Sequence, residues 1–177
     1  MGLDQVADLS AKLDAILKAA GFTTGSVGER LTALNTRPEQ LYANSDAGRK
    51  ELIDGLNAGV AAMWSKLPQA FSDIPKLPLE IRRVPKAIEA GAPGGYYNSP
   101  TLDGSRPGAF YINLRDTAVW PRFSLPTFVY HEGIPGHVFQ GAVLLGTDLP
   151  LLHRSLGIAA YGEGWGLYAE QIADELG

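Results

Sequence analysis

The sequence predicts a mainly helical fold with one small antiparallel β-sheet, an α+β architecture. Two observations support this prediction. Apolar residues recur at the spacing of a helix face over most of residues 1–74 and again after residue 124. Between residues 75 and 113, prolines and glycines interrupt short extended runs, a pattern typical of strands and turns. We therefore expect a helical segment over residues 1–74, and a small sheet with further helices over residues 75–177 of the same domain.

The first helix is predicted from apolar side chains at helical spacing, which are Leu3, Val6, Leu9, Leu13, Ile16, Leu17 and Ala20. Gly21 then supplies a stop. A second, short helix is expected after Ser26, because Ser26 and Glu29 have the spacing of a capping box. This helix must end before Pro38.

A third, longer helix is expected to begin near Ser45 and to end before Pro68. Its apolar stripe consists of Leu52, Ile53, Leu56, Val60, Met63 and Trp64. Core packing is the simplest role for the stripes of all three helices.

Three extended runs are expected to form the small antiparallel sheet, over residues 79–84, 96–97 and 109–114. In the last run, alternation places Phe110, Ile112 and Leu114 on one face. Tyr111 and Asn113 share the opposite face.

Helices return after the sheet. One is expected to begin at Ser124 or Thr127 and to run to about Leu145, and Asp148 with Pro150 then opens a short helix. The last helical segment follows Gly157.

The last segment carries two glutamates on one helical stripe, formed by Ala159, Glu163, Gly166 and Glu170. It also contains three glycines, Gly162, Gly164 and Gly166, each of which costs about 1 kcal/mol in a helix relative to alanine. Close approach to the helix that carries His131 would explain them. The aromatic residues of the segment, Tyr161, Trp165 and Tyr168, are interpreted as core residues.

The composition describes a chain that can bury one core of ordinary domain size, since 45% of its 177 residues are apolar. Its net charge of −4, without a basic cluster, argues against nucleic acid as a partner. No apolar run approaches the roughly 18 residues of a membrane span. Asp4 and Asp8 stand where a signal peptide would be basic and then apolar, but the compartment stays open, and cytoplasmic and exported parent proteins are both compatible with the chain.

The strongest functional signal is the run His131-Glu132-Gly133-Ile134-Pro135-Gly136-His137. Two neutral imidazoles and one carboxylate can hold zinc with an open position for water, and a glutamate beside the first histidine can take that water's proton. The chain has no cysteine, so a zinc site here must use histidine and carboxylate.

The spacing of the two histidines is unusual for such a site. Ligands of the HExxH type are four residues apart on one helix face. His131 and His137 are six residues apart, about 240° around an ideal helix. Between them, Gly133, Pro135 and Gly136 permit a locally widened turn. From the residues alone, the segment is either an expanded zinc-binding helix or no metal site.

The run HEGIPGH, the later run EGWGLYAE and the upstream residues 103–114 together resemble the bacterial domain-of-unknown-function 885 (DUF885) family of zincin-like metallopeptidases. The resemblance extends from about Leu79 to the C-terminus, and more weakly over the N-terminal helices. It implies a zincin-like catalytic domain that binds Zn²⁺ through His131, His137 and Glu163. It also implies that Glu132 is the general base, with a peptide as substrate.

Two departures from this family stand out. Members often carry a further histidine where this chain has Val138. They are also several hundred residues long, with helices before and after the region present here. The chain is therefore expected to be a fragment, incomplete at its C-terminus, for which the remainder of the parent chain would be a partner. Alone, it is expected to bind zinc but to hydrolyse peptides poorly or not at all.

Several further residues receive expected roles around the zinc. Glu170 is expected to orient a ligating histidine, as carboxylates beside zinc sites commonly do. Tyr111 and Asn113 are expected near bound substrate if the sheet edge takes up a peptide, as it does in zincins. The alternative is a purely structural sheet with irregular loops. Tyr130 and Tyr111 are expected to line the cleft. His153 has no acidic partner at ligand spacing and is expected to be structural or exposed.

The alternative is a non-catalytic structural or metal-binding module, in which the histidines are packed and no competent cleft exists. Stoichiometric zinc would decide between the two. A serine or cysteine hydrolase has little support, because the chain lacks cysteine and has no G-x-S-x-G run.

Overall fold

The computed structural model describes residues 2–75, 79–98, 101, 105–106, 108–150, 152–153 and 156–177. It forms two compact units, Met1–Leu41 and Tyr42–Gly177. The third predicted helix thus belongs to the second unit, because it packs on the sheet and on the helix of His131. The expected segments, residues 1–74 and 75–177 of one domain, stay a prediction.

The first unit consists of α1 (Gly2–Ala19), α2 (Val27–Asn35) and the 3₁₀ turn Pro38–Gln40. Gly21 ends α1 with a φ of +88°, which glycine adopts without a steric penalty. The predicted capping box is confirmed, because Ser26 and Glu29 satisfy each other's backbone N–H groups. Arg30 holds the two helices together with a salt bridge to Asp14 and hydrogen bonds to the carbonyls of Phe22 and Ser26.

The apolar stripe of α1 is largely exposed. Leu17 is buried, at 2% exposure, but Leu3, Val6, Leu9 and Ile16 are between 57% and 86% exposed. The expectation that this stripe packs in a core is wrong for these four residues. Periodicity identified the helix but not whether its apolar face is covered.

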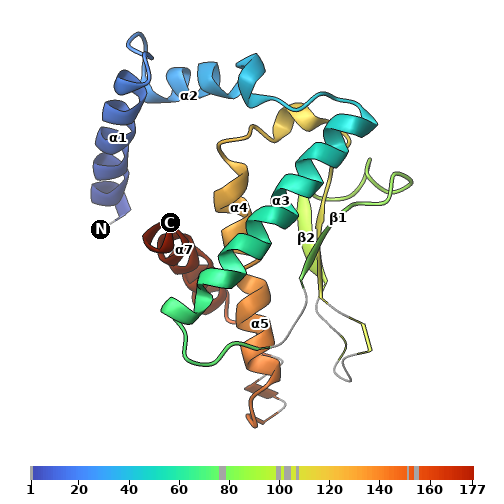
Figure 1. Ribbon diagram of the computed structural model, residues 1–177. Coiled ribbons are helices and arrows are strands. Elements are labelled where there is room, and N and C mark those ends of the chain that lie inside the picture. Colours follow the sequence, from blue (N-terminus) through green and yellow to red (C-terminus); the bar gives the residue numbers. More distant parts are fainter. Residues whose placement is uncertain are drawn as a thin grey trace. The chain divides into compact units, whose positions relative to one another are not determined.

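In the second unit, α3 (Asp46–Lys66) begins after Ser45, whose hydroxyl accepts a hydrogen bond from the Gly48 N–H. Its predicted stripe is confirmed, because Leu52, Leu56, Val60 and Met63 are all buried. The 3₁₀ turn Leu67–Gln69 follows. Figure 1 shows α3 crossing α4 and running beside the sheet, against which its buried face packs.

The sheet contains β1 (Glu80–Arg83), β2 (Gly95–Asn98) and β3 (Ala109–Ile112) in the order β1-β3-β2. β3 pairs antiparallel with β2 and parallel with β1, so the sheet is mixed and not wholly antiparallel as expected. The parallel pair arises because the chain reverses direction at β2 and again at β3, and β3 then inserts between the other two strands. The predicted shared face of Phe110, Ile112 and Leu114 is confirmed, and it points into the core, since all three residues are at most 1% exposed.

Beyond the sheet lie the 3₁₀ turn Thr117–Val119, α4 (Leu125–Glu132), α5 (His137–Leu145) and α7 (Ala159–Leu176). The expectation of a single helix that runs to about Leu145 is wrong, because residues 133–136 form a turn between α4 and α5. The expected short helix after Pro150 falls largely outside the described residues, and so does part of the 103–114 stretch.

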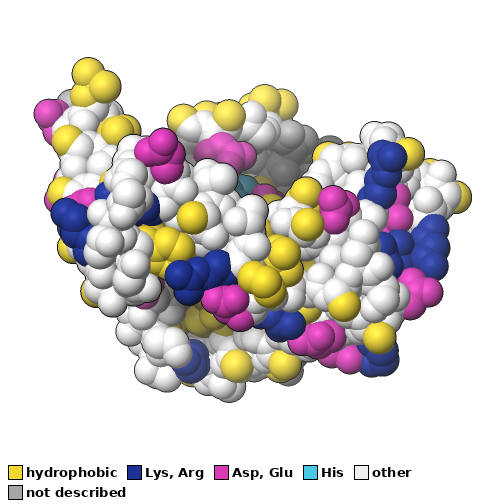
Figure 2. Space-filling view, turned by 90° about the horizontal axis from the view of Figure 1, so that it is seen from above, with side chains coloured by type: hydrophobic (Ala, Val, Ile, Leu, Met, Phe, Trp, Pro, Cys, Tyr) yellow, Lys and Arg dark blue, Asp and Glu magenta, His cyan; other side chains and the backbone are white. Residues whose placement is uncertain are grey.

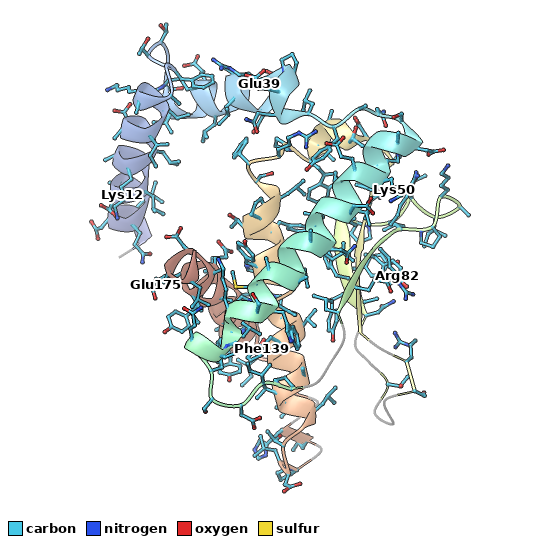
Figure 3. All side chains as sticks on the ribbon, in the orientation of Figure 1. Lys12, Glu39, Lys50, Arg82, Phe139 and Glu175 are labelled. Carbon is cyan, nitrogen blue, oxygen red and sulfur yellow. The ribbon has the colours of Figure 1, made fainter. Side chains whose placement is uncertain are left out.

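The helical part of this unit shares one core with the sheet. Phe139 of α5, labelled in Figure 3, packs against Phe71 with ring centroids 4.7 Å apart. α7 packs against α4 and α5 (Figure 1). The α+β prediction is confirmed, because the molecule is mainly helical and contains one small sheet. Within the described residues, no helix combines the length and apolar character needed to cross a membrane.

Candidate metal centre

The turn between α4 and α5 brings the two histidines of the HEGIPGH run together. His131 is the penultimate residue of α4, and His137 is the first residue of α5. The Gly133 N–H closes α4 by donating to the Val129 carbonyl at 2.7 Å. The two imidazole rings lie with centroids 4.9 Å apart and planes 87° apart. The two histidines meet because the helix ends completely between them, and not because of the widened helical turn that was expected.

Glycine at position 136 is a steric requirement of this turn. A β-carbon there would stand 1.8 Å from the carbonyl oxygen of His131 and 2.3 Å from that of Tyr130. Gly133 is similarly confined, since its β-carbon would stand 2.6 Å from the Val129 oxygen. The Ile134–Pro135 peptide bond in the turn is cis.

α7 adds a carboxylate to the two imidazoles. Glu163 Oε2 lies 3.4 Å from His131 Nε2 and 3.8 Å from His137 Nε2. One ligand atom from each of the three residues can be chosen so that all lie within 4.8 Å of one another. The Glu163 side chain is 67% exposed, so the group is open to solvent on that side. In Figure 2 a histidine side chain is visible at the surface close to acidic side chains.

Glu170 contacts the other nitrogen of His131. Its Oε1 lies 2.7 Å from His131 Nδ1, and both side chains are largely buried. A carboxylate at this distance favours the tautomer with the proton on Nδ1, which leaves the Nε2 lone pair directed at Glu163 and His137. Glu163 and Glu170 thus contact opposite nitrogens of one imidazole from the same helix.

The helix of the two glutamates comes close to His131 because of Gly166. A β-carbon at Gly166 would stand 2.6 Å from two atoms of the His131 ring. Gly162 and Gly164 have open space around them. The close approach that the sequence predicted for the three glycines therefore depends on Gly166 alone.

The electrostatic surroundings of His131 are acidic. Burial of the ring by itself lowers the pKa of His131, but the carboxylates of Glu170, Glu132 and Glu163 outweigh it, and the pKa of His131 is raised above its ordinary value. Three carboxylates around one imidazole also form an attractive environment for a cation.

Glu132 ends α4 beside His131 and is half-buried. Its carboxylate acts on the His131 ring through charge. It makes no hydrogen bond or ion pair with any other side chain in the described parts of the chain. Among the described residues, this carboxylate therefore has no side-chain partner that would compete for it.

Three residues were expected near bound substrate, and their surroundings in the structure differ. Tyr111 lies on β3, which is paired along both sides, so this strand offers no free edge to a peptide. Asn113 donates from its amide to the carbonyls of Glu89 and Ala92, and this leaves it no free N–H group for a substrate. Tyr130 packs half-buried against the core from α4.

Trp165 contacts the site although the sequence indicated only a core residue. Its indole N–H donates to the carbonyls of Pro135 at 2.9 Å and Gly136 at 3.2 Å. The position of Trp165 two residues after Glu163 was the only sequence signal for its contact with the turn.

The other two aromatic residues of α7, Tyr161 and Tyr168, were expected in the core but are 70% and 55% exposed. His153 is exposed, as expected.

Comparison with known proteins places these residues in a wider context. The sequence model of one family, described as "Bacterial protein of unknown function (DUF885)", matches residues 1–177. The chain is also similar to a solved structure described as "the putative lipoprotein from Colwellia psychrerythraea", with 46% identity and a TM-score of 0.95. That match covers 99% of this chain and 30% of the solved chain, so the sequence spans less than a third of that relative. No curated protein matches the chain.

Proposed function

The chain belongs to the bacterial DUF885 family of unknown function, and for it we propose zinc-dependent hydrolysis of peptide bonds, with His131, His137 and Glu163 as the zinc ligands. The observation that carries the proposal is the convergence of one ligand atom from each of these three residues within 4.8 Å.

The two separations that involve Glu163 support the proposal of a single zinc ion. Donor atoms bound to one tetrahedral zinc at about 2.0–2.1 Å lie about 3.4 Å apart. The separations of Glu163 Oε2 from the two imidazole Nε2 atoms, 3.4 and 3.8 Å, are close to this value. Two imidazoles and one carboxylate also form the ligand set of hydrolytic zinc sites, which keep one position open.

Each residue of the group then has a chemical task. A bound zinc ion would supply a Lewis acid that activates water and polarises a scissile carbonyl. Glu132, beside the first ligand, would accept the water proton and pass it to the leaving amine. Glu170 would hold His131 in the tautomer and orientation that direct Nε2 at the metal.

The substrate class rests on resemblance. HEGIPGH with EGWGLYAE resembles the corresponding runs of zincin-like metallopeptidases, whose substrates are peptides. The sheet edges available for a peptide strand are those of β1 and β2, because the central strand is paired on both sides.

A non-catalytic module is the second candidate, and one observation favours it. The raised pKa of His131 means that its imidazolium form pairs well with Glu170 and Glu163. The same cluster would then be a set of ion pairs that needs no metal. The two candidates differ in whether the group binds zinc in stoichiometric amounts.

Elemental analysis of protein purified without added metal tests the proposal. We expect about one zinc per chain in the wild type, and none in His131→Ala or His137→Ala. His153→Ala is the matched control, because this histidine is exposed and outside the cluster, and it should keep its zinc. Glu132→Gln should keep its zinc, and any peptide hydrolysis that the wild type shows should be lost in this variant. Equal zinc in the wild type and His131→Ala would refute the site.

A further inference from the structure

The position of His137 depends on the turn of residues 133–136 that directly precedes it. Gly136 precedes α5 without a side-chain hydrogen bond to cap the helix. Residues 133–136 are all buried, and Pro135 has no N–H to donate. Because His137 is the first residue of α5, any shift of the turn moves its imidazole relative to His131.

Trp165 contacts this turn from α7. Its indole N–H lies 2.9 Å from the carbonyl oxygen of Pro135 and 3.2 Å from that of Gly136. The Gly136 carbonyl also accepts from the Gln140 N–H at 2.9 Å. Among the described residues only the indole donates to the Pro135 carbonyl, and a buried carbonyl without a donor is costly, so this hydrogen bond favours the observed conformation of the turn. The indole is itself held in place by Phe71 and Tyr168, with ring centroids 6.3 and 6.1 Å away.

Trp165 also lies at a particular place on α7. It stands two residues after Glu163 and directly before Gly166, which contacts the His131 ring. The hydrogen bond therefore connects the helix that supplies the carboxylate with the turn that separates the two histidines. We therefore expect loss of this hydrogen bond to change the distance between Glu163 and His137. The helices α5 and α7 themselves should stay intact.

We infer that Trp165 is a positioning residue of the His131–His137–Glu163 site, which fixes the turn before His137 against α7 through its indole N–H. This role rests on the proposed function, because it is expressed in how tightly the three ligands hold zinc. Trp165 contacts none of the three ligand side chains through a hydrogen bond within the described residues, and it acts through the backbone of the turn.

The chain offers a matched control for this role. Trp120 also donates its indole N–H to a backbone carbonyl, that of Asn113, at 2.7 Å. Trp165→Phe and Trp120→Phe thus remove the same kind of hydrogen bond and the same atoms. If Trp165 had only a structural role, Trp165→Phe and Trp120→Phe would both lower stability, and neither would change the zinc affinity.

The test measures zinc affinity by competition with a chromophoric chelator, and the absorption spectrum of the Co²⁺-loaded protein. We expect Trp165→Phe to weaken zinc binding by roughly 10- to 100-fold, the usual effect of residues that orient metal ligands, and to change the Co²⁺ spectrum. Trp120→Phe should stay within about 2-fold of the wild type. Wild-type affinity and spectrum in Trp165→Phe would overturn the inference.

Two further measurements keep the outcome decisive. If Trp165→Phe does not fold, 3-benzothienylalanine at position 165 preserves the ring shape without the N–H, and it should show the same loss of affinity. If the wild type binds no zinc, the proposed function fails, and the imidazole NMR signals of the metal-free protein test the positioning role. These signals should shift in Trp165→Phe and not in Trp120→Phe, and unchanged signals would refute the role.

Discussion

Gly166 lies so close to His131 that a β-carbon added to this glycine would stand 2.6 Å from both Cε1 and Nε2 of the imidazole. Nε2 is also the nitrogen nearest to Glu163. Because Gly166 has no side chain, the His131 ring can lie against α7 with its Nε2 atom near Glu163. This relationship makes the glycine a sensitive probe of the site.

Gly166→Ala should displace the His131 ring and weaken zinc binding by about 10-fold or more. It should also lower the free energy of unfolding by about 1–3 kcal/mol, as expected for overpacking. Gly164→Ala is the control, because a β-carbon there meets open space, and it should stabilise α7 by up to about 1 kcal/mol. Zinc titration and urea denaturation measure both effects. Equal behaviour of the two variants would show that the close approach does not exist in solution.

Gly136→Ala should be more damaging, because the added β-carbon would meet the rigid backbone oxygen of His131 at 1.8 Å. We expect a loss of at least about 3 kcal/mol in the free energy of unfolding, together with loss of stoichiometric zinc. Gly141→Ala, within α5 and with nothing near its β-carbon, should be neutral or slightly stabilising. Denaturation curves of the two variants compare them directly, and a stable, zinc-loaded Gly136→Ala would contradict the turn described above.

The sequence predicted features that depend on neighbouring residues. The capping box of Ser26 and Glu29 and the buried stripe of α3 follow from local spacing, and both are confirmed. The stripe of Glu163, Gly166 and Glu170 on one helix was also visible in the sequence, because helical periodicity fixes which side chains share a face.

Features that depend on distant parts of the chain were missed. The parallel pairing of β1 with β3 requires β3 to insert between two strands, which no local pattern reveals. The break after Glu132 depends on the tertiary packing of Ile134, which is fully buried. Asn113 has the polarity of a substrate-binding residue, and only the fold shows that its amide is bound to a neighbouring loop.

The buried ion pair of Arg83 and Glu89 makes a pH-dependent contribution to stability. Arg83 Nε and Nη2 lie 2.6 and 2.9 Å from the two carboxylate oxygens of Glu89, which is 7% exposed. The hydrogen bonds from Arg83 lower the pKa of Glu89 below its ordinary value of 4.5. A lowered pKa in the folded state means that the pair stabilises above the unfolded pKa and loses its contribution as the pH falls below it.

Glu89→Gln should therefore lower the free energy of unfolding by about 1–3 kcal/mol at pH 7, and the difference from the wild type should shrink as the pH falls below 4.5. Titration of other carboxylates cancels in this comparison. Glu80→Gln is the control, since Glu80 pairs with Arg82 in an exposed position and should change stability little at any pH. Urea denaturation at several pH values provides the test, and a constant difference between wild type and Glu89→Gln would rule out the linkage.

The two glutamates of α7 should differ in their effect on zinc binding, although both contact His131. Glu163 contacts Nε2 and is near His137, so its carboxylate is placed to bind the metal directly. Glu170 contacts Nδ1 and can act only through the orientation and basicity of the ring. Glu163→Ala should therefore abolish stoichiometric zinc, and Glu170→Ala should weaken zinc binding by about 10- to 100-fold while leaving one site per chain. Glu175→Ala, on the same helix but outside the cluster, serves as the control and should bind zinc like the wild type. A zinc titration in which Glu170→Ala loses the metal and Glu163→Ala keeps it would reverse the roles of the two carboxylates.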